Sequence, residues 1–199
     1  MMMFVSINGT AKNGGGSIFQ YNPSGKQNTA LSSLDRPRGL DFDKTNNLFV
    51  ATNKYDVNTD NIQGTIFKIT PGGEISTLAA GFPTNFFLEG LVTDSHGNVF
   101  VVGQDQADPN GACTIFLITP GGAISTFGSV PAVPGQSFGL AFDSAGDLFI
   151  AETGDAAPGD ILEFTPAGAR TVFASGLGRP EGNGGAEFLA FKRGGSLLP

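Results

Sequence analysis

Residues able to bind ligands recur at one position of this chain, immediately before the glycine that opens a short apolar segment. The segments read RGL, EGL and FGL, so the position holds Arg38, Glu89 and Phe138. A fourth copy supplies either Glu181, in RPEG, or Glu187, in EFLAF. Opposite charges at equivalent repeat positions can bind a polar ligand together, and two carboxylates can bind a divalent cation. We therefore predict a ligand-binding site at these five residues, with Glu89 and Glu181 as candidate metal ligands.

Two interpretations of the charged residues at this position stay open. In the first, Glu89 and Glu181 hold a polar ligand or a cation such as calcium, zinc or manganese, with Arg38 opposite. In the second, Arg38 and a glutamate neutralise each other without a ligand, as buried charges commonly do. No cofactor is predicted to be required, and the divalent cation of the first interpretation would lie in the central channel.

Several other polar residues fit structural roles better than chemical ones. Asp43, Asp94 and Asp143 each begin a turn, in DKTNN, DSHGN and DSAGD. The side chain of an Asp at such a position accepts a hydrogen bond from the backbone N–H group two residues further along the chain. His96 lies in the second of these turns, and we expect it to be exposed. Cys113 stands at the entry to a strand, where we expect a packed thiol.

The segment DVNTDN places Asp56, Asn58 and Asp60 at alternate positions, as in a calcium-binding loop. Such a loop needs Gly at its sixth position and Glu at its twelfth, but this chain has Asn61 and Phe67 there. We therefore predict a solvated polar loop. The chain also lacks a phosphate-binding loop and the paired Cys or clustered His of a zinc site. No catalytic residue is predicted.

The elements that carry these residues repeat with a period near 48 residues. SIFQYNPSGK, TIFKITPGGE, TIFLITPGGA and DILEFTPAGA align on Pro23, Pro71, Pro120 and Pro166, at steps of 48, 49 and 46. Between them lie RGLDFDKTNNLFVAT, EGLVTDSHGNVFVVG and FGLAFDSAGDLFIAE. A fixed period of about 20 to 50 residues is typical of solenoids and propellers.

Each repeat contains four short apolar segments separated by turn residues, without helical periodicity. The second segment is continuously apolar, so both faces of its sheet should be covered. We predict an all-β fold, a four-bladed β-propeller with four-stranded antiparallel blades. Full repeats span about 36–80, 87–128 and 137–175, and the remaining blade joins three strands within 4–31 to a C-terminal strand at 187–191. This last strand closes the ring, so that residues 1–199 form a single domain.

The repeat pattern R/P-x-G-L-x-x-D-x-x-G-N-L-F-V-A, followed by G-x-I-x-x-x-T-P-G-G, resembles that of NHL and SMP-30/gluconolactonase-like propellers over about residues 17–192. The resemblance implies the fold, but the group includes lactonases, lyases, synthases and binding domains. Its SMP-30-type enzymes are longer and six-bladed. Only Glu89, in LEGL, and Glu181, in RPEG, match their metal-binding Glu, and no Asn or Asp matches the other ligands.

Charge and composition narrow the possible partners and compartments. The formal net charge of −7 argues against nucleic acid, which is bound by clustered Lys and Arg. The sequence has no run of about 20 apolar residues, so no membrane span is predicted, and no signal peptide is visible. We expect a soluble, acidic monomer. It would be extracellular or periplasmic if an export signal had been removed, and cytoplasmic otherwise.

The loops of the predicted fold indicate where binding takes place. Loops between the second and third strands of a blade, and those between blades, differ in length and content; we call their end of the sheets the loop face. The other turns are uniform and define the turn face. Because variable loops on a rigid scaffold commonly carry binding, we predict a non-enzymatic binding or scaffold module, acting on a small molecule or protein at the loop face and the central channel mouth. The alternatives are a divalent-metal-dependent lactonase-type hydrolase, and a piece of a larger propeller.

Overall fold

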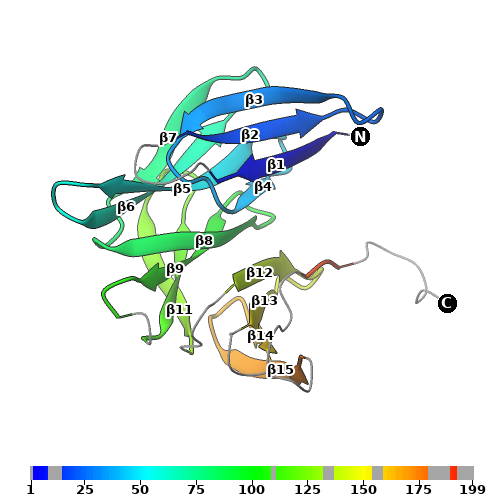
Figure 1. Ribbon diagram of the computed structural model, residues 1–199. Coiled ribbons are helices and arrows are strands. Elements are labelled where there is room, and N and C mark those ends of the chain that lie inside the picture. Colours follow the sequence, from blue (N-terminus) through cyan, green and yellow to red (C-terminus); the bar gives the residue numbers. More distant parts are fainter. Residues whose placement is uncertain are drawn as a thin grey trace. The chain divides into compact units, whose positions relative to one another are not determined.

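The chain folds into antiparallel β-sheets joined by tight turns (Figure 1). The computed structural model describes residues 2–8, 15–108, 111–131, 137–153, 159–178 and 189–191. Within these ranges the regular structure consists of strands, without helices, in four sheets whose strands follow one another in chain order. Such consecutive meanders are the blades of a β-propeller. The predicted all-β fold class with four blade sheets is confirmed.

The bounds of the strands follow the predicted repeats closely. The first sheet contains β1 (Met3–Ile7), β2 (Gly16–Tyr21) and β3 (Gln27–Leu34). The second contains β4 (Leu40–Phe42), β5 (Leu48–Asp56), β6 (Asn61–Ile69) and β7 (Ile75–Ala80). The third contains β8 (Phe86–Thr93), β9 (Val99–Asp105), β10 (Cys113–Ile118) and β11 (Ile124–Val130). The fourth contains β12 (Ser137–Phe142), β13 (Leu148–Thr153), β14 (Gly159–Phe164) and β15 (Arg170–Leu177).

The contacts divide the chain into two compact units. Residues 1–132 form one unit, with the first three sheets, and residues 133–199 form the other, with the fourth sheet. The prediction of a single domain over residues 1–199 stays a prediction.

The predicted closing strand at 187–191 is not found among the described residues. Leu189–Phe191 belong to no strand, and residues 187 and 188 lie outside the described ranges. Within the described chain the first sheet therefore has three strands, and β1 pairs with β2. The Phe191 ring instead contacts the ring of Phe149 in β13, with centroids 4.9 Å apart. Phe191, which was expected to pair with β1, thus makes an aromatic contact with the fourth sheet.

Strand β5 shows why the second segment of each repeat is continuously apolar. Successive side chains of a strand point to opposite faces. Phe49 and Ala51 belong to a core shared with the third sheet, whereas Leu48 and Val50 pack with Ile18 of the first sheet. Burial on both faces, predicted from the sequence, is confirmed for this strand.

The segment 53–63 is mostly strand, although the sequence predicts it as the variable loop between the second and third strands of its blade. β5 continues to Asp56 and β6 starts at Asn61, so only residues 57–60 form the turn. Tyr55 pairs with the buried Ile62 in this extension. A regular antiparallel register carries polar residues as readily as apolar ones, because the backbone supplies the hydrogen bonds. The loop face of the second blade is therefore a protruding hairpin.

The first strands of the second and third sheets approach each other closely at a glycine. The Gly39 amide donates a hydrogen bond to the Glu89 carbonyl at 3.0 Å. A Cβ atom at Gly39 would lie 2.4 Å from the Leu91 amide nitrogen. Only glycine permits this backbone contact without a shift of one strand. The contact sets the residues just before Gly39 beside those just before Leu91.

Candidate functional site

Arg38 and Glu89 lie side by side, although they are 51 positions apart in the sequence. Arg38 precedes β4 and Glu89 lies within β8. The Nε atom of Arg38 is 3.8 Å from a carboxylate oxygen of Glu89. The Arg38 amide donates to the Ala51 carbonyl at 2.9 Å, and the neighbouring Gly39 amide donates to Glu89 itself. Backbone hydrogen bonds thus hold both residues in position.

The two charges differ in their exposure to solvent. The Arg38 side chain is 40% exposed, and its guanidinium lies over the Phe87 ring, 4.9 Å from the ring centre. The Glu89 side chain is 21% exposed. Burial raises the pKa of Glu89 to about 7, and the Arg38 charge opposes this rise. At neutral pH the Glu89 carboxyl is therefore partly protonated and can both donate and accept hydrogen bonds.

The structure brings together two of the five residues predicted to bind a ligand, Arg38 and Glu89. Phe138 is buried in β12 of the second unit, opposite Glu152 of β13. Glu181 and Glu187 lie outside the described residues. The ion pair agrees with the interpretation that Arg38 and a glutamate neutralise each other. A shared site of all five residues stays a prediction.

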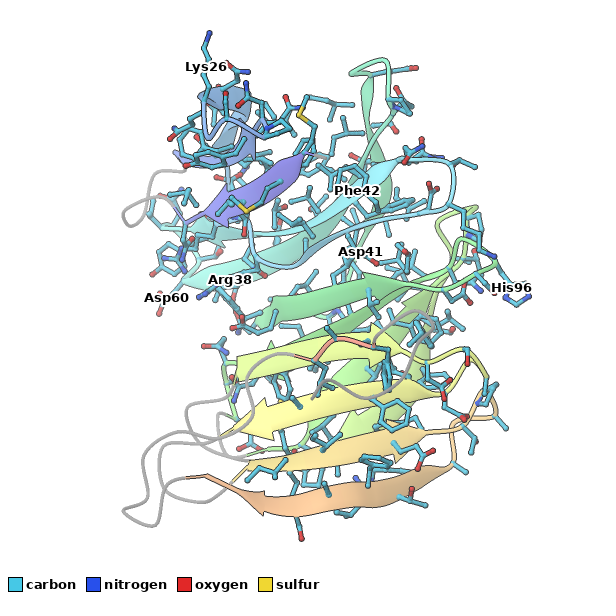
Figure 2. The ribbon with its side chains drawn as sticks, turned by 90° about the vertical axis from the view of Figure 1, so that its right-hand side faces the viewer. Lys26, Arg38, Asp41, Phe42, Asp60 and His96 are labelled. Atoms are coloured by element: carbon cyan, nitrogen blue, oxygen red, sulfur yellow. The ribbon has the colours of Figure 1, made fainter. Side chains whose placement is uncertain are left out.

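Within the first unit the two ends of the sheets carry the features expected of them. Figure 2 shows Arg38 and Asp60 at one end of the sheets and His96 at the other. Asp60 belongs to the turn between β5 and β6, and His96 to the turn between β8 and β9. Arg38 therefore lies at the loop face of this unit, away from the turn face.

The turn face of the first unit also carries a hollow, of about 320 Å³. The turns of the second and third sheets line it, together with Phe49, Lys68, Leu78 and Pro120. The sequence predicts binding at the loop face and gives no sign of this hollow. Asp43 and Asp94 lie at the hollow, but their carboxylates accept hydrogen bonds within their own turns.

The recurrent aspartates have the predicted turn role. Asp43 accepts hydrogen bonds from the amides of Thr45 and Asn47, at 2.8 and 2.9 Å. Asp94 and Asp143 accept the equivalent bonds in their own turns. Burial acts to raise the pKa of Asp43, but the hydrogen bonds outweigh it and the pKa is lowered. These carboxylates stabilise turns and are not available for chemistry.

The remaining candidate residues also have the predicted surroundings. The side chain of His96 is 83% exposed, and Cys113 is buried at the start of β10. The Asp56 carboxylate accepts the Asn58 amide at 2.9 Å, and the Tyr55 hydroxyl donates to Asp60, as expected of a polar turn. Across the described ranges, no three His, Cys, Asp or Glu side chains are grouped so that they could hold a metal ion. The described chain likewise has no helix long and apolar enough to span a membrane.

Two polar residues that join the second and third sheets were missed from the sequence. Asn53 is fully buried; its side-chain amide donates to the Leu88 carbonyl at 2.8 Å, and its oxygen accepts the Leu88 amide at 2.7 Å. Asp41 accepts both the amide and the hydroxyl of Thr93, at 2.8 and 2.9 Å. No sequence signal marks these bonds, because they join strands of different repeats. They hold β8 in the position that places Glu89.

Glu152, at the end of β13, was also missed. It is 5% exposed, and burial, with the charge of Asp160, raises its pKa to about 7, while Arg170 acts in the opposite direction. A comparison of the repeats could have found it, since Thr52 and Gly103 occupy the equivalent positions.

Comparisons with known proteins identify the fold. No protein-family model matches the sequence, and no curated protein does. A solved structure of a predicted gluconolactonase matches with a TM-score of 0.60 and 15% identity, over 90% of this chain and 66% of the other. An exo-β-1,3-galactanase from Clostridium thermocellum matches with a TM-score of 0.60 and 10% identity, over 89% of this chain and 46% of the galactanase. The exo-β-1,3-galactanase of Phanerochaete chrysosporium, solved with β-1,3-galactotriose, matches with a TM-score of 0.60 and 13% identity. The match covers 87% of this chain and 46% of the galactanase.

These similarities, together with the strand topology, place the chain in the β-propeller class, with four blade sheets. At such identities they show the fold alone. The chain spans about two thirds of the length of the first of these structures and about half of the other two.

Proposed function

We propose that this protein is a β-propeller binding module that recognises a polar, hydroxyl-rich small molecule at Arg38 and Glu89. The observation that carries the proposal is their contact at 3.8 Å. This separation exceeds the roughly 2.7–3.2 Å of an N–H···O hydrogen bond. The donors of Arg38 and the acceptors of Glu89 are therefore not consumed by each other. A hydroxyl group, which both donates and accepts, can bond to both.

The surroundings of the pair favour a neutral polar ligand. Glu89 is partly protonated near pH 7, so it can offer a donor as well as an acceptor to neighbouring hydroxyls. Arg38 is half-exposed and therefore reachable from solvent, and the Phe87 ring beneath it limits its movement. The net charge of −7 disfavours polyanions. Similarity to structures named for a sugar lactone and for galactans supports a sugar-like ligand as the first class to test.

Titration calorimetry with D-glucono-δ-lactone and β-1,3-galactotriose tests this proposal. We expect one of them to bind, and the double variant Arg38→Ala/Glu89→Gln to lose at least about tenfold in affinity, since it removes charge-assisted hydrogen bonds. The matched control is Lys68→Ala/Glu74→Gln, which removes the same two charges from β6 and from the turn that follows it. Unchanged affinity in the first double variant would reject Arg38 and Glu89 as the binding site.

The second candidate function is a divalent-metal-dependent lactonase-type hydrolase with Glu89 as a ligand. The observation in its favour is the match of 90% of this chain to a predicted gluconolactonase. The Arg38 cation beside Glu89 counts against it, because a second cation at the same carboxylate is repelled. Elemental analysis of the purified protein, followed by lactone hydrolysis assays with calcium, zinc and manganese, tests this function. Turnover that depends on one metal and is lost in Glu89→Gln would support it.

A further inference from the structure

Two carboxylates face each other in the fourth sheet. Glu152 of β13 and Asp160 of β14 are directly opposite in the antiparallel register. Residues paired in this way have their side chains on the same face, with Cβ atoms about 4.5–5.5 Å apart. Like charges at that separation repel each other. The arrangement therefore requires something that compensates the negative charge.

Compensation of the Glu152 charge by the described residues is incomplete: the Arg170 charge acts to lower the pKa of Glu152, but burial and the Asp160 charge outweigh it. Glu152 is 5% exposed, and its Oε2 atom has no hydrogen-bond partner in the described part of the chain. On its other side it is paired with Phe138, which is 7% exposed and offers no polar group. A buried carboxylate oxygen without a partner is costly, so such groups are rare unless they serve a purpose.

The repeat itself does not require acids at these two positions. The equivalent pair in the second sheet is Thr52 and Thr65, and in the third sheet it is Gly103 and Thr114. The same strands thus form the same pairing with neutral side chains. The carboxylates are an addition to the fourth sheet, and the stability of the blade does not explain them.

We propose that Glu152 and Asp160 together hold a hard divalent cation, calcium or magnesium. Both residues offer oxygen donors, which these cations prefer, whereas zinc favours the nitrogen and sulfur donors of His and Cys. Asp160 is oriented by the Gly176 amide, which donates to its Oδ1 atom at 3.2 Å. Magnesium is commonly bound by only one or two carboxylates and completes its shell with water. A cation here would remove both the repulsion and the unpaired oxygen.

The competing explanation is that Glu152 is simply protonated. Burial is the largest cause that raises its pKa to about 7, and the Asp160 charge adds to it, so a neutral carboxyl would also relieve the repulsion. This explanation leaves no role for added cations. The two explanations therefore differ in whether calcium or magnesium binds.

Calorimetric titration of the chelator-treated, desalted full chain with calcium chloride and then magnesium chloride tests the proposal. We expect one site per chain, occupied at millimolar concentration or below, within the roughly 10⁻⁸ to 10⁻³ M range of protein calcium sites. Glu152→Gln and Asp160→Asn should each weaken binding at least about tenfold, since ligand charge governs affinity. Glu163→Gln is the matched control. It removes the same charge from β14, but Glu163 is an odd number of positions from Asp160 and so lies on the opposite face.

The melting temperature, followed with and without each salt, gives a second readout. The cation should raise it in the wild type and in Glu163→Gln, and not in Glu152→Gln. If Glu152→Gln does not fold, the half-buried Asp160 provides the informative variant. Absence of both heat and a melting shift at about 10 mM of either salt would overturn the proposal. So would binding that is unchanged in both Glu152→Gln and Asp160→Asn.

Discussion

Removing the charge of Glu89 should make the protein more stable at neutral and alkaline pH. The Glu89 side chain is 21% exposed, and burial raises its pKa from 4.5 to about 7 despite the nearby Arg38. The folded state thus holds a proton on Glu89 that the unfolded state releases at lower pH. Stability from this group is fully present below about pH 4.5 and is lost as the pH rises to 7. Glu89→Gln mimics the protonated form at every pH.

The size of the effect follows from the pKa change. A rise of 7 − 4.5 = 2.5 units corresponds to about 3 kcal/mol, at about 1.4 kcal/mol per unit. Allowing for partial exposure, we expect about 2 kcal/mol. Glu89→Gln and the wild type should therefore have the same free energy of unfolding near pH 4.5. At about pH 8 the variant should be more stable by about 2 kcal/mol.

Urea unfolding at a series of pH values measures this difference directly. Glu152 has a similarly raised pKa and contributes to the pH dependence of both proteins, so the difference between them isolates Glu89. Glu74→Gln is the control, since Glu74 is exposed in a turn and its removal should give no such dependence. A difference that is constant with pH, or a wild type that is the more stable protein at pH 8, would refute the reasoning. The second result would mean that the ion pair with Arg38 outweighs the cost of burying Glu89.

Two further variants test how the second and third sheets are joined. Asn53→Ala should lower the free energy of unfolding, measured by urea titration, by about 3 kcal/mol, because it leaves the buried amide and carbonyl of Leu88 without partners. Its control is Asn58→Ala at an exposed position, which should change the free energy of unfolding by less than about 0.5 kcal/mol. Gly39→Ala should cost about 3 kcal/mol, since its Cβ would lie 2.4 Å from a backbone nitrogen of β8. Gly72→Ala, whose Cβ would meet its nearest neighbour at 3.7 Å, should be nearly neutral by thermal unfolding. Equal losses in each variant and its control would show that these contacts do not join the sheets.

Much of the fold could be predicted because the information for it is local and repeated. A turn such as DKTNN closes through bonds between residues two to four positions apart, as Asp43 shows, so its conformation is encoded where it occurs. The continuous apolar run of β5 likewise encodes a strand covered on both faces. Three copies of these signals defined the blades and their order.

Extents of strands and the chemistry of the site depended on contacts between distant residues. The extension of β5 and β6 through residues 53–63 rests on pairing across the hairpin, and the apolar pattern stops short of it. Phe191 is apolar, as a closing strand requires, but its ring packs on Phe149 instead. Phe191 also stays 45% exposed, so an apolar residue type fixes neither the burial of a side chain nor the partner that it contacts.

The sequence by itself determined the repeat, the turns, and the equivalent positions of Arg38 and Glu89 in their repeats. Only the tertiary structure decided that these two lie 3.8 Å apart and that Glu89 is mostly buried. It also decided that Glu152 faces Asp160 and that the Glu152 Oε2 atom has no hydrogen-bond partner in the described part of the chain. The physical reason is the range of the interactions. Turn hydrogen bonds act within a few residues, whereas ion pairing and burial depend on which strands the folded chain brings together.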